Sequence, residues 1–279
     1  MIGGEASPYY EFTGWSPDPS KPIVENTTFY AQFAFDGYIE DSWEEIIEAC
    51  KAGNTDKYGL GGRKTLTYTF GGVESTVEME IVGKNHDTLA TVDPSYNGGA
   101  STAALSFMAC VVGPETRPMN QEVPEWDNGS VDSEGNPNRG YNNGGWAETA
   151  MRKELQGEFF NILPAYLQNN IKPVRKLSDR GYYAQYLHET TDTIWLPSAA
   201  ELNGEFVNEV VLGQGKPYPL FNLNPSRIKK NQNGNAVLYW TRSSGLGLSH
   251  FFTYVALNGY VYYTGGGASS YSVAFGFCL

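Results

Sequence analysis

The segment 243–279 constrains the fold more than any other part of the chain, because it contains no Asp, Glu, Lys or Arg. Tyr, Phe, Gly and Ser instead crowd together at 249–254 and 260–271. One interpretation is structural: Gly- and Tyr-rich strands and turns that close a β-rich domain. The other is functional, because recognition surfaces use Tyr for rigid amphipathic contact and use Ser and Gly for adaptable hydrogen bonding.

The same segment uses a restricted set of amino acids. Lys, Glu, Gln, Met and Trp do not occur in it, although all five occur repeatedly earlier in the chain. These are the five residues that no codon ending in a pyrimidine encodes. The segment therefore has the composition expected of a stretch whose codons all end in a pyrimidine.

The overall charge and the cysteines argue against several classes of function. A net charge of -12 and a pI near 4.7 disfavour binding to nucleic acid or anionic lipid, because phosphate binding requires a basic patch and none is visible. Cys50, Cys110 and Cys278 are odd in number and widely separated, so we expect buried free thiols. No apolar stretch approaches the ~18 to 20 residues of a membrane span. We therefore expect a soluble chain without membrane insertion.

Local patterns predict both helices and strands. Helices are expected at 41–53, with Asp41 or Ser42 as the cap, at 146–155 and at 164–171. Strands are expected at 63–70, 75–82, 105–112 and 193–197, and a last β region begins at 236. Ser198 is expected to cap a short helix through Leu202. Because strands flank the helices without regular βαβ alternation, the prediction is one α+β domain over residues 36–279.

Residues 1–35 are too few to hold a core of their own. They read FTGWSP at 12–17 and NTTFYAQF at 26–33. This part resembles the second half of an internalin-type B-repeat, a small β-grasp module found in tandem on surface and phage proteins. The resemblance implies a partial repeat or the end of a stalk that belongs to a longer protein.

Catalytic motifs are scarce. His188-Glu189 begins like the helix of a zinc protease, but no second His follows at the spacing that places two imidazoles on one face, so a surface loop is expected. A Gly-x-Ser-x-Gly nucleophile elbow is absent. We therefore predict a protein that is not an enzyme and has no cofactor.

The acidic loop at 127–138 leaves a second function open. Its carboxylates and carbonyls on a tight loop suit a hard cation such as calcium, although the spacing is not that of an EF-hand. The alternative function is therefore a calcium-dependent carbohydrate-binding lectin module.

A further set of motifs resembles a known family in order and spacing. The matching stretches are GGW at 144–146, MRKEL at 151–155, LPA at 163–165, IKPV at 171–174, TDTIWLPSAAE at 191–201, YWTRS at 239–243 and VAFGFCL at 273–279. They resemble C-type-lectin-fold domains of gut bacteria and their phages, over roughly residues 36–279. That family includes the variable proteins of diversity-generating retroelements, in which an error-prone reverse transcriptase rewrites the last segment of the gene.

The resemblance implies both a fold and a function. The fold would be C-type-lectin-like, and the function would be non-enzymatic binding of a protein or glycan receptor on a target cell, from a phage virion or a bacterial cell surface. Template adenines mutated in this way turn Asn codons into any codon ending in a pyrimidine, which would explain the restricted alphabet. The stretches 240–242 and 274–279 would be invariant brackets, with Arg242 in a structural role.

Formylglycine-generating enzymes share the same fold, and they use a pair of cysteines near the carboxyl end. Cys278 has no such partner in this region of the sequence, so a degenerate enzyme of that type is the less favoured alternative.

Between the two brackets lie the side chains that we predict to contact ligand. They are His250, Phe251, Tyr254, Tyr260, Tyr262, Tyr263, Ser269, Ser270 and Tyr271. Exposed aromatic side chains of this kind can stack on sugars or on protein side chains. Because side chains alternate along a strand, we expect Phe252, Val255 and Val261 to point into the core.

Overall fold

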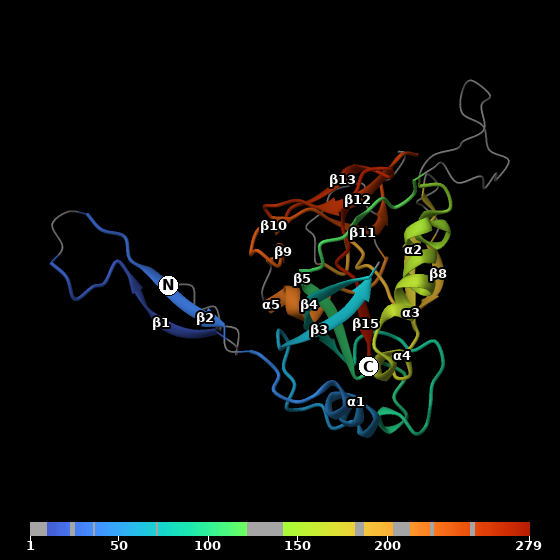
Figure 1. Ribbon diagram of the computed structural model, residues 1–279, viewed down its shortest axis with the longest axis horizontal. Helices are drawn as coiled ribbons and strands as arrows, with labels where there is room; N and C mark the ends of the chain where they lie inside the picture. Colours follow the sequence, from blue (N-terminus) through green and yellow to red (C-terminus); the bar gives the residue numbers. More distant parts are fainter. Residues whose placement is uncertain are drawn as a thin grey trace.

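The computed structural model describes residues 10–22, 26–35, 37–70, 72–121, 142–181, 187–202, 213–223, 226–245 and 249–279. These residues form a mixed α+β structure with four β-sheets. Figure 1 shows a two-stranded ribbon on one side and a larger body in which helices flank the sheets. The predicted α+β class is therefore confirmed. Within the described residues no helix is both long and apolar enough to span a membrane.

The ribbon consists of β1 (Tyr10–Ser16) and β2 (Tyr30–Phe35), which pair in antiparallel fashion. Its Trp15 and Tyr30 side chains are exposed. The ribbon lies in the part of the chain that resembles a B-repeat.

The first helix, α1 (Trp43–Ala52), begins and ends where the sequence predicted. The Ser42 hydroxyl accepts a hydrogen bond from the backbone N–H of Glu45, and the Glu45 carboxylate accepts one from the N–H of Ser42. This reciprocal pair satisfies two donors that a helix start leaves unpaired. Gly53 ends the helix with a φ of 73°, which is favourable for glycine.

The larger sheet is built on β5 (Leu105–Val112), a strand that the apolar run at 105–112 predicted correctly. One edge of β5 pairs with β4 (Val73–Lys84), which pairs in turn with β3 (Arg63–Phe70). The other strands of the sheet are β9 (Lys229–Asn231), which pairs with β5 in parallel, β10 (Ala236–Val237), and β15 (Gly276–Cys278), which is antiparallel to β5. The end of the chain therefore lies in the sheet that the first third of the chain builds.

The second sheet carries the uncharged C-terminal segment. Its order is β13 (Val261–Gly266), β12 (Phe251–Val255), β11 (Tyr239–Ser244), β14 (Tyr271–Ser272) and β6 (Thr116–Arg117). All its pairs are antiparallel except β11 with β14. A separate hairpin joins β7 (Val174–Asp179) to β8 (Leu187–Asp192).

The helical connections are shorter and more broken than the sequence predicted. Described in chain order, they are the 3-10 turns η1 (Asn97–Gly99) and η2 (Gly145–Glu148), α2 (Ala150–Glu154), the π-helical turn η3 (Leu155–Phe159), α3 (Phe160–Ile162), α4 (Ala165–Gln168) and α5 (Pro219–Leu223). Thr149 caps α2 through a bond from Arg152 N–H, so Trp146 belongs to the preceding turn and not to the helix.

Three local predictions were wrong. Residues 193–197 form no strand, because only Trp195 makes a bridge, to Gly276. Ser198 does accept a hydrogen bond from Glu201 N–H, but the turn that it caps does not continue as a helix. His188 and Glu189 lie in β8 and not in a loop, and both are exposed.

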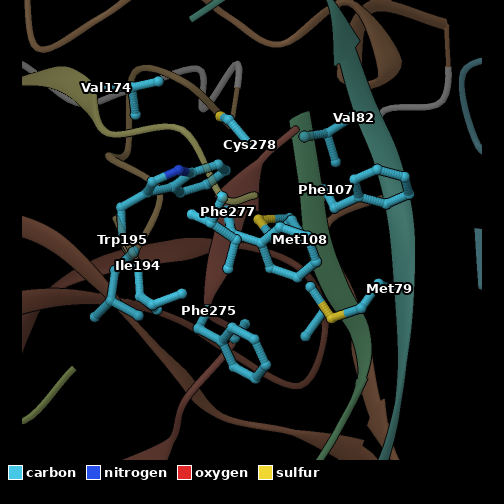
Figure 2. Packing of buried hydrophobic residues seen from close by; sticks show 14 of the residues in the cluster. Met79, Val82, Phe107, Met108, Val174, Ile194, Trp195, Phe275, Phe277 and Cys278 are labelled. Carbon is cyan, nitrogen blue, oxygen red and sulfur yellow. The ribbon is translucent and has the colours of Figure 1, made fainter. Parts of the chain in front are cut away.

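The core joins β15 to segments from the first half and the middle of the chain. Figure 2 shows Phe275, Phe277 and Cys278 beside Trp195, Phe107 and Met108, all of them buried. Phe107 and Phe277 stack with ring centroids 5.6 Å apart. β15 can approach β5 this closely only because Gly276 has no side chain: a Cβ there would lie 2.3 Å from Cη2 of Trp195 and 2.7 Å from the Phe107 carbonyl oxygen.

We therefore expect Gly276→Ala to destabilise the fold by about 1–3 kcal/mol, because it would overpack the core. Gly266→Ala in β13 is the matched control, since a Cβ there would meet only the Ser269 hydroxyl, at 3.4 Å. Urea denaturation followed by tryptophan fluorescence measures both. Equal stability of the two variants would contradict the packing described for β15.

Candidate ligand-binding surface

Three tyrosines from different strands lie together on one face of the second sheet. Tyr262 on β13 is the cross-strand partner of Tyr254 on β12, and their rings stack with centroids 5.7 Å apart. The Tyr271 ring, from β14, lies 5.0 Å from that of Tyr254. We call Tyr254, Tyr262 and Tyr271 the tyrosine row. Tyr262 is exposed and the other two are half-buried.

A buried tryptophan supports the row from beneath. Trp240 on β11 pairs with Tyr254, and its ring lies 4.4 Å from that of Tyr271. The indole Nε1 donates a hydrogen bond to the Arg117 carbonyl oxygen at 2.7 Å, which fixes the ring. Gly265 makes room for this arrangement, because a Cβ there would lie 2.6 Å from the Trp240 ring and 2.9 Å from the Tyr254 ring. The row is thus held in place before any ligand arrives.

The other six predicted contact residues lie in the same strands or next to them. Tyr260 directly precedes β13 and is 65% exposed, and His250 directly precedes β12 and is also exposed. The rest are exposed (Ser270) or half-buried (Phe251, Tyr263 and Ser269). All nine residues can therefore be reached from solvent, and whether they contact a ligand stays a prediction. The predicted core residues Phe252, Val255 and Val261 are buried, as expected. β12 does not alternate strictly, however, because its neighbours Phe252 and Thr253 are both buried beside a register shift.

Sequence reasoning missed the loop that holds the start of β12. The Asn142 N–H donates to the Ser249 carbonyl oxygen at 3.1 Å, and its side-chain amide donates to that of Phe251 at 2.8 Å. This loop can approach β7 because Gly181 lacks a side chain: a Cβ there would lie 1.8 Å from the Asn142 carbonyl oxygen. No periodic pattern in the sequence indicates a contact between loops so far apart in the chain.

Arg242, on β11, is fully buried beneath this surface. Its guanidinium donates to both carboxylate oxygens of Glu201, at 2.5 and 2.8 Å, and to the carbonyl oxygens of Leu177, Leu196 and Gln214. Every contact is with the protein interior. The expectation that Arg242 has a structural role is confirmed.

Lys176 extends the buried pair into a network of four charges. Its ammonium lies 2.5 Å from Asp87 and 3.2 Å from Glu201, and it donates to the Tyr218 hydroxyl at 2.7 Å. Burial alone would raise the pKa of Asp87 and of Glu201, but the neighbouring cations hold both pKa values below their usual range. Burial would likewise lower the pKa of Lys176, and the two carboxylates raise it instead. All four groups are therefore charged and mutually compensated.

Asp179, at the end of β7, is buried without such compensation. Its carboxylate accepts hydrogen bonds from the backbone N–H groups of Gly181 and Ser244 and from the Gln214 amide. Burial raises its pKa to about 6, and these three donors only partly offset that effect. Asp179 thus links β7 to the end of β11 through a carboxylate that can change its charge near neutral pH.

The described residues offer little for metal or thiol chemistry. They contain no group of three or more His, Cys, Asp or Glu side chains placed to hold a metal ion. The predicted calcium loop at 127–138 lies outside them. All three cysteines are buried free thiols, as expected, and burial raises the pKa of Cys50 and Cys110 to about 12 and that of Cys278 well above its usual value.

Comparison with known proteins gives one match. The model of a family described as a domain of unknown function, DUF6273, matches residues 125–276, which is more than half of the chain. No match was found among curated proteins or among solved structures. The matched range contains the tyrosine row, Trp240 and Arg242, whereas β3, β4 and β5 lie outside it.

Arg242→Met should destabilise the protein by about 3–5 kcal/mol, because it leaves Glu201 buried beside only one cation. Arg175→Met is the control: the Arg175–Glu189 pair is about half exposed, with side-chain exposures of 47% and 49%, so its loss should cost about 1 kcal/mol or less. Both values follow from urea denaturation at pH 7. Similar losses in the two variants would contradict the structural role of Arg242.

The raised pKa of Asp179 predicts a pH dependence. Its folded pKa of about 6 lies above the usual value of 3.8, so its contribution to stability is complete below pH 3.8 and is lost as the pH rises through 6. Between pH 4 and pH 7, wild type should lose about 3 kcal/mol relative to Asp179→Asn, which does not titrate. Denaturation of both proteins across this range measures the difference. A constant difference between them would show that Asp179 has an ordinary pKa.

Proposed function

We propose that this chain, which belongs to the DUF6273 domain family, is a non-enzymatic binding protein whose tyrosine row forms the centre of its ligand-binding surface. The observation that carries the proposal is the stacking of Tyr254, Tyr262 and Tyr271 at the surface over a buried Trp240. Aromatic side chains that are already ordered lose little entropy when they bind, and they bring a large contact area.

The residues around the row support the same conclusion. The strands that carry the row lie in a segment without charged side chains. A ligand that binds there would therefore not have to remove the water around a charged group of this segment. Tyr and Ser side chains at the rim provide hydroxyl groups for a glycan or a peptide backbone. The ligand that we propose is accordingly a protein or glycan receptor on a target cell.

The proposal includes diversification of this surface. Its exposed positions stand on buried supports: Trp240 beneath the row, the Arg242 network beneath β11, and the core residues that follow Val273. A scaffold of this kind can keep its fold while exposed side chains change, because surface substitutions away from special contacts usually have small effects on stability. Together with the restricted alphabet, this supports a C-type-lectin-like variable protein of a diversity-generating retroelement.

The two alternative functions are less well supported. The Cys278 thiol is buried against Asp87, and the raised pKa keeps it in the unreactive thiol form. This disfavours chemistry of the formylglycine-generating type. A calcium-dependent lectin module would need the loop at 127–138, and calorimetric titration with calcium distinguishes it from the calcium-independent surface proposed above. We place the protein on a phage virion or a bacterial cell surface, as part of a longer chain.

Replacing the tyrosine row with serines should abolish binding while the fold persists. The variant Tyr254→Ser, Tyr262→Ser, Tyr271→Ser and the wild type are labelled and applied to arrayed glycans and to a panel of gut bacterial cells. We expect a glycan or cell that wild type binds to lose at least about tenfold in affinity for the variant, because central aromatic residues dominate such interfaces.

The matched control is Tyr30→Ser, which removes an exposed tyrosine from the N-terminal ribbon, outside the proposed surface. It should bind like wild type. Circular dichroism and thermal melting confirm that each variant is folded. A folded triple variant that binds as tightly as wild type would refute the proposed surface.

Diversification has a separate test in the surrounding DNA. A near-copy of the 3′ end of the gene should lie beside a reverse-transcriptase gene and should differ from it only where the copy has adenine. The absence of this arrangement would contradict diversification without affecting the binding proposal.

A further inference from the structure

A narrow cavity opens beside the tyrosine row, between β3, the residues that join β5 to β6, and the helical stretch α2–η3. Its empty volume is about 380 Å³ when the space open to solvent at its mouth is included, and its interior admits groups about the size of a water molecule. Most of its lining belongs to residues before 160, so the cavity is largely independent of the C-terminal segment.

Glu115 supplies the polar end of the cavity. Its carboxylate accepts hydrogen bonds from Ser75 Oγ at 2.8 Å and from the Tyr68 hydroxyl at 3.3 Å. Gly113 allows these groups to converge, because a Cβ there would lie 2.3 Å from Glu115 Oε2 and 2.7 Å from the Tyr68 hydroxyl oxygen. A hydroxyl group on each side thus orients the carboxylate.

The charges around the cavity do not cancel. Arg117 also lines it, but its guanidinium Nε pairs with Glu154 at 2.8 Å. Within the described part of the chain, no Lys or Arg nitrogen comes within 4.0 Å of the Glu115 carboxylate. Two carboxylates and one guanidinium therefore line the cavity, and among the described residues Glu115 has no ion-pair partner.

The remaining walls are aromatic and aliphatic. Phe159 lies between Tyr68 and Phe275, with ring centroids 5.3 and 4.7 Å from theirs, and all three rings line the cavity. Met151, Leu155 and Val273 complete the apolar lining. An anion would be repelled here, and a purely apolar group would cover the carboxylate without giving it a counterion. A small cation on an apolar stem satisfies both features, because aromatic rings and a carboxylate attract the cation while the stem contacts the aliphatic wall.

We propose that this cavity binds a primary alkylammonium group, namely the side chain of a lysine on a protein ligand, with its ammonium at Glu115 and its methylene chain against Met151, Leu155 and Val273. The ammonium is close to a water molecule in size and therefore suits the narrow interior. Its three donors can reach the free lone pairs of the carboxylate. The cavity adjoins the proposed binding surface, since Arg117 is the cross-strand partner of Tyr271.

The test uses the full chain and two matched small probes, N-acetyl-lysine methylamide and N-acetyl-norleucine methylamide. They share the aliphatic stem and differ in the ammonium. Met151 lines the cavity, so its ¹³C-labelled methyl group, identified with Met151→Leu, reports binding by NMR. We expect a saturable shift of this signal with the lysine probe and a much smaller one with the norleucine probe.

Two substitutions then locate the charge responsible. Glu115→Gln keeps the shape and an acceptor oxygen but removes the charge, so it should weaken lysine-probe binding by about tenfold or more. Glu158→Gln removes the same charge from an exposed neighbour of the cavity residue Phe159, and it should change binding by less than about twofold. Thermal melting checks that both variants are folded.

Three results would overturn the proposal: no saturable shift with the lysine probe, equal shifts with the two probes, or equal weakening in the two variants. Without a saturable shift, the cavity would hold only water. Equal shifts with the two probes would mean that it binds apolar groups without regard to charge. Equal weakening in the two variants would mean that the overall negative charge of the protein, and not Glu115, attracts the lysine probe. If Glu115→Gln fails to fold, the comparison of the two probes on wild type still decides the question.

Discussion

The structure depends on the buried contact between Arg242 and Glu201. The Arg242 guanidinium binds Glu201, in a turn after β8. It also donates to the carbonyl oxygens of Leu177, Leu196 and Gln214, and so fixes the beginning of the C-terminal segment to three further stretches of the chain. Lys176 then ties the same carboxylate to Asp87 and so to the larger sheet. Burying four charges is costly, and in some proteins such networks specify one particular arrangement of the chain. Here that arrangement is the position of β11, from which the neighbouring strands β12 and β14 take theirs.

The surface above this network has the opposite character. Its residues are aromatic, small and uncharged, and their contacts with one another are ring stacking and van der Waals packing, which tolerate exchange of side chains better than ion pairs do. Arg242 is the last charged residue of the sequence, and the uncharged segment that follows it carries the tyrosine row but also buried core residues such as Phe252 and Phe275. The polar end of the cavity, formed by Tyr68, Ser75 and Glu115, comes from the part of the chain before this segment.

Much of the local structure could be predicted from sequence, and the reasons are specific. Ser42, Glu45 and Gly53 mark the ends of α1 through local hydrogen bonds, and the apolar run at 105–112 predicts a buried strand whatever its partners are. The strand predicted at 193–197 does not form. The apolar side chains of this stretch are buried by β15, some eighty residues later, and not by strand neighbours of their own. The stacking of the tyrosine row depends equally on register shifts in β12 and β13 and on Gly265, which no local pattern shows. The network partners of Arg242 come from four separate stretches, so only its structural role, and not its geometry, could be foreseen.

The placement of β15 has a consequence for how the protein is made. β5 is complete by residue 112, yet the edge that β15 occupies stays open until residues 276–278 have left the ribosome. While the residues between β5 and β15 are made, the nascent chain therefore presents an apolar strand edge with unpaired backbone groups, a feature that promotes wrong association. Residues 276–278 close this edge long after β5 has been made. Substitutions in the uncharged C-terminal segment must leave these residues able to pair with β5 for the chain to reach its native state.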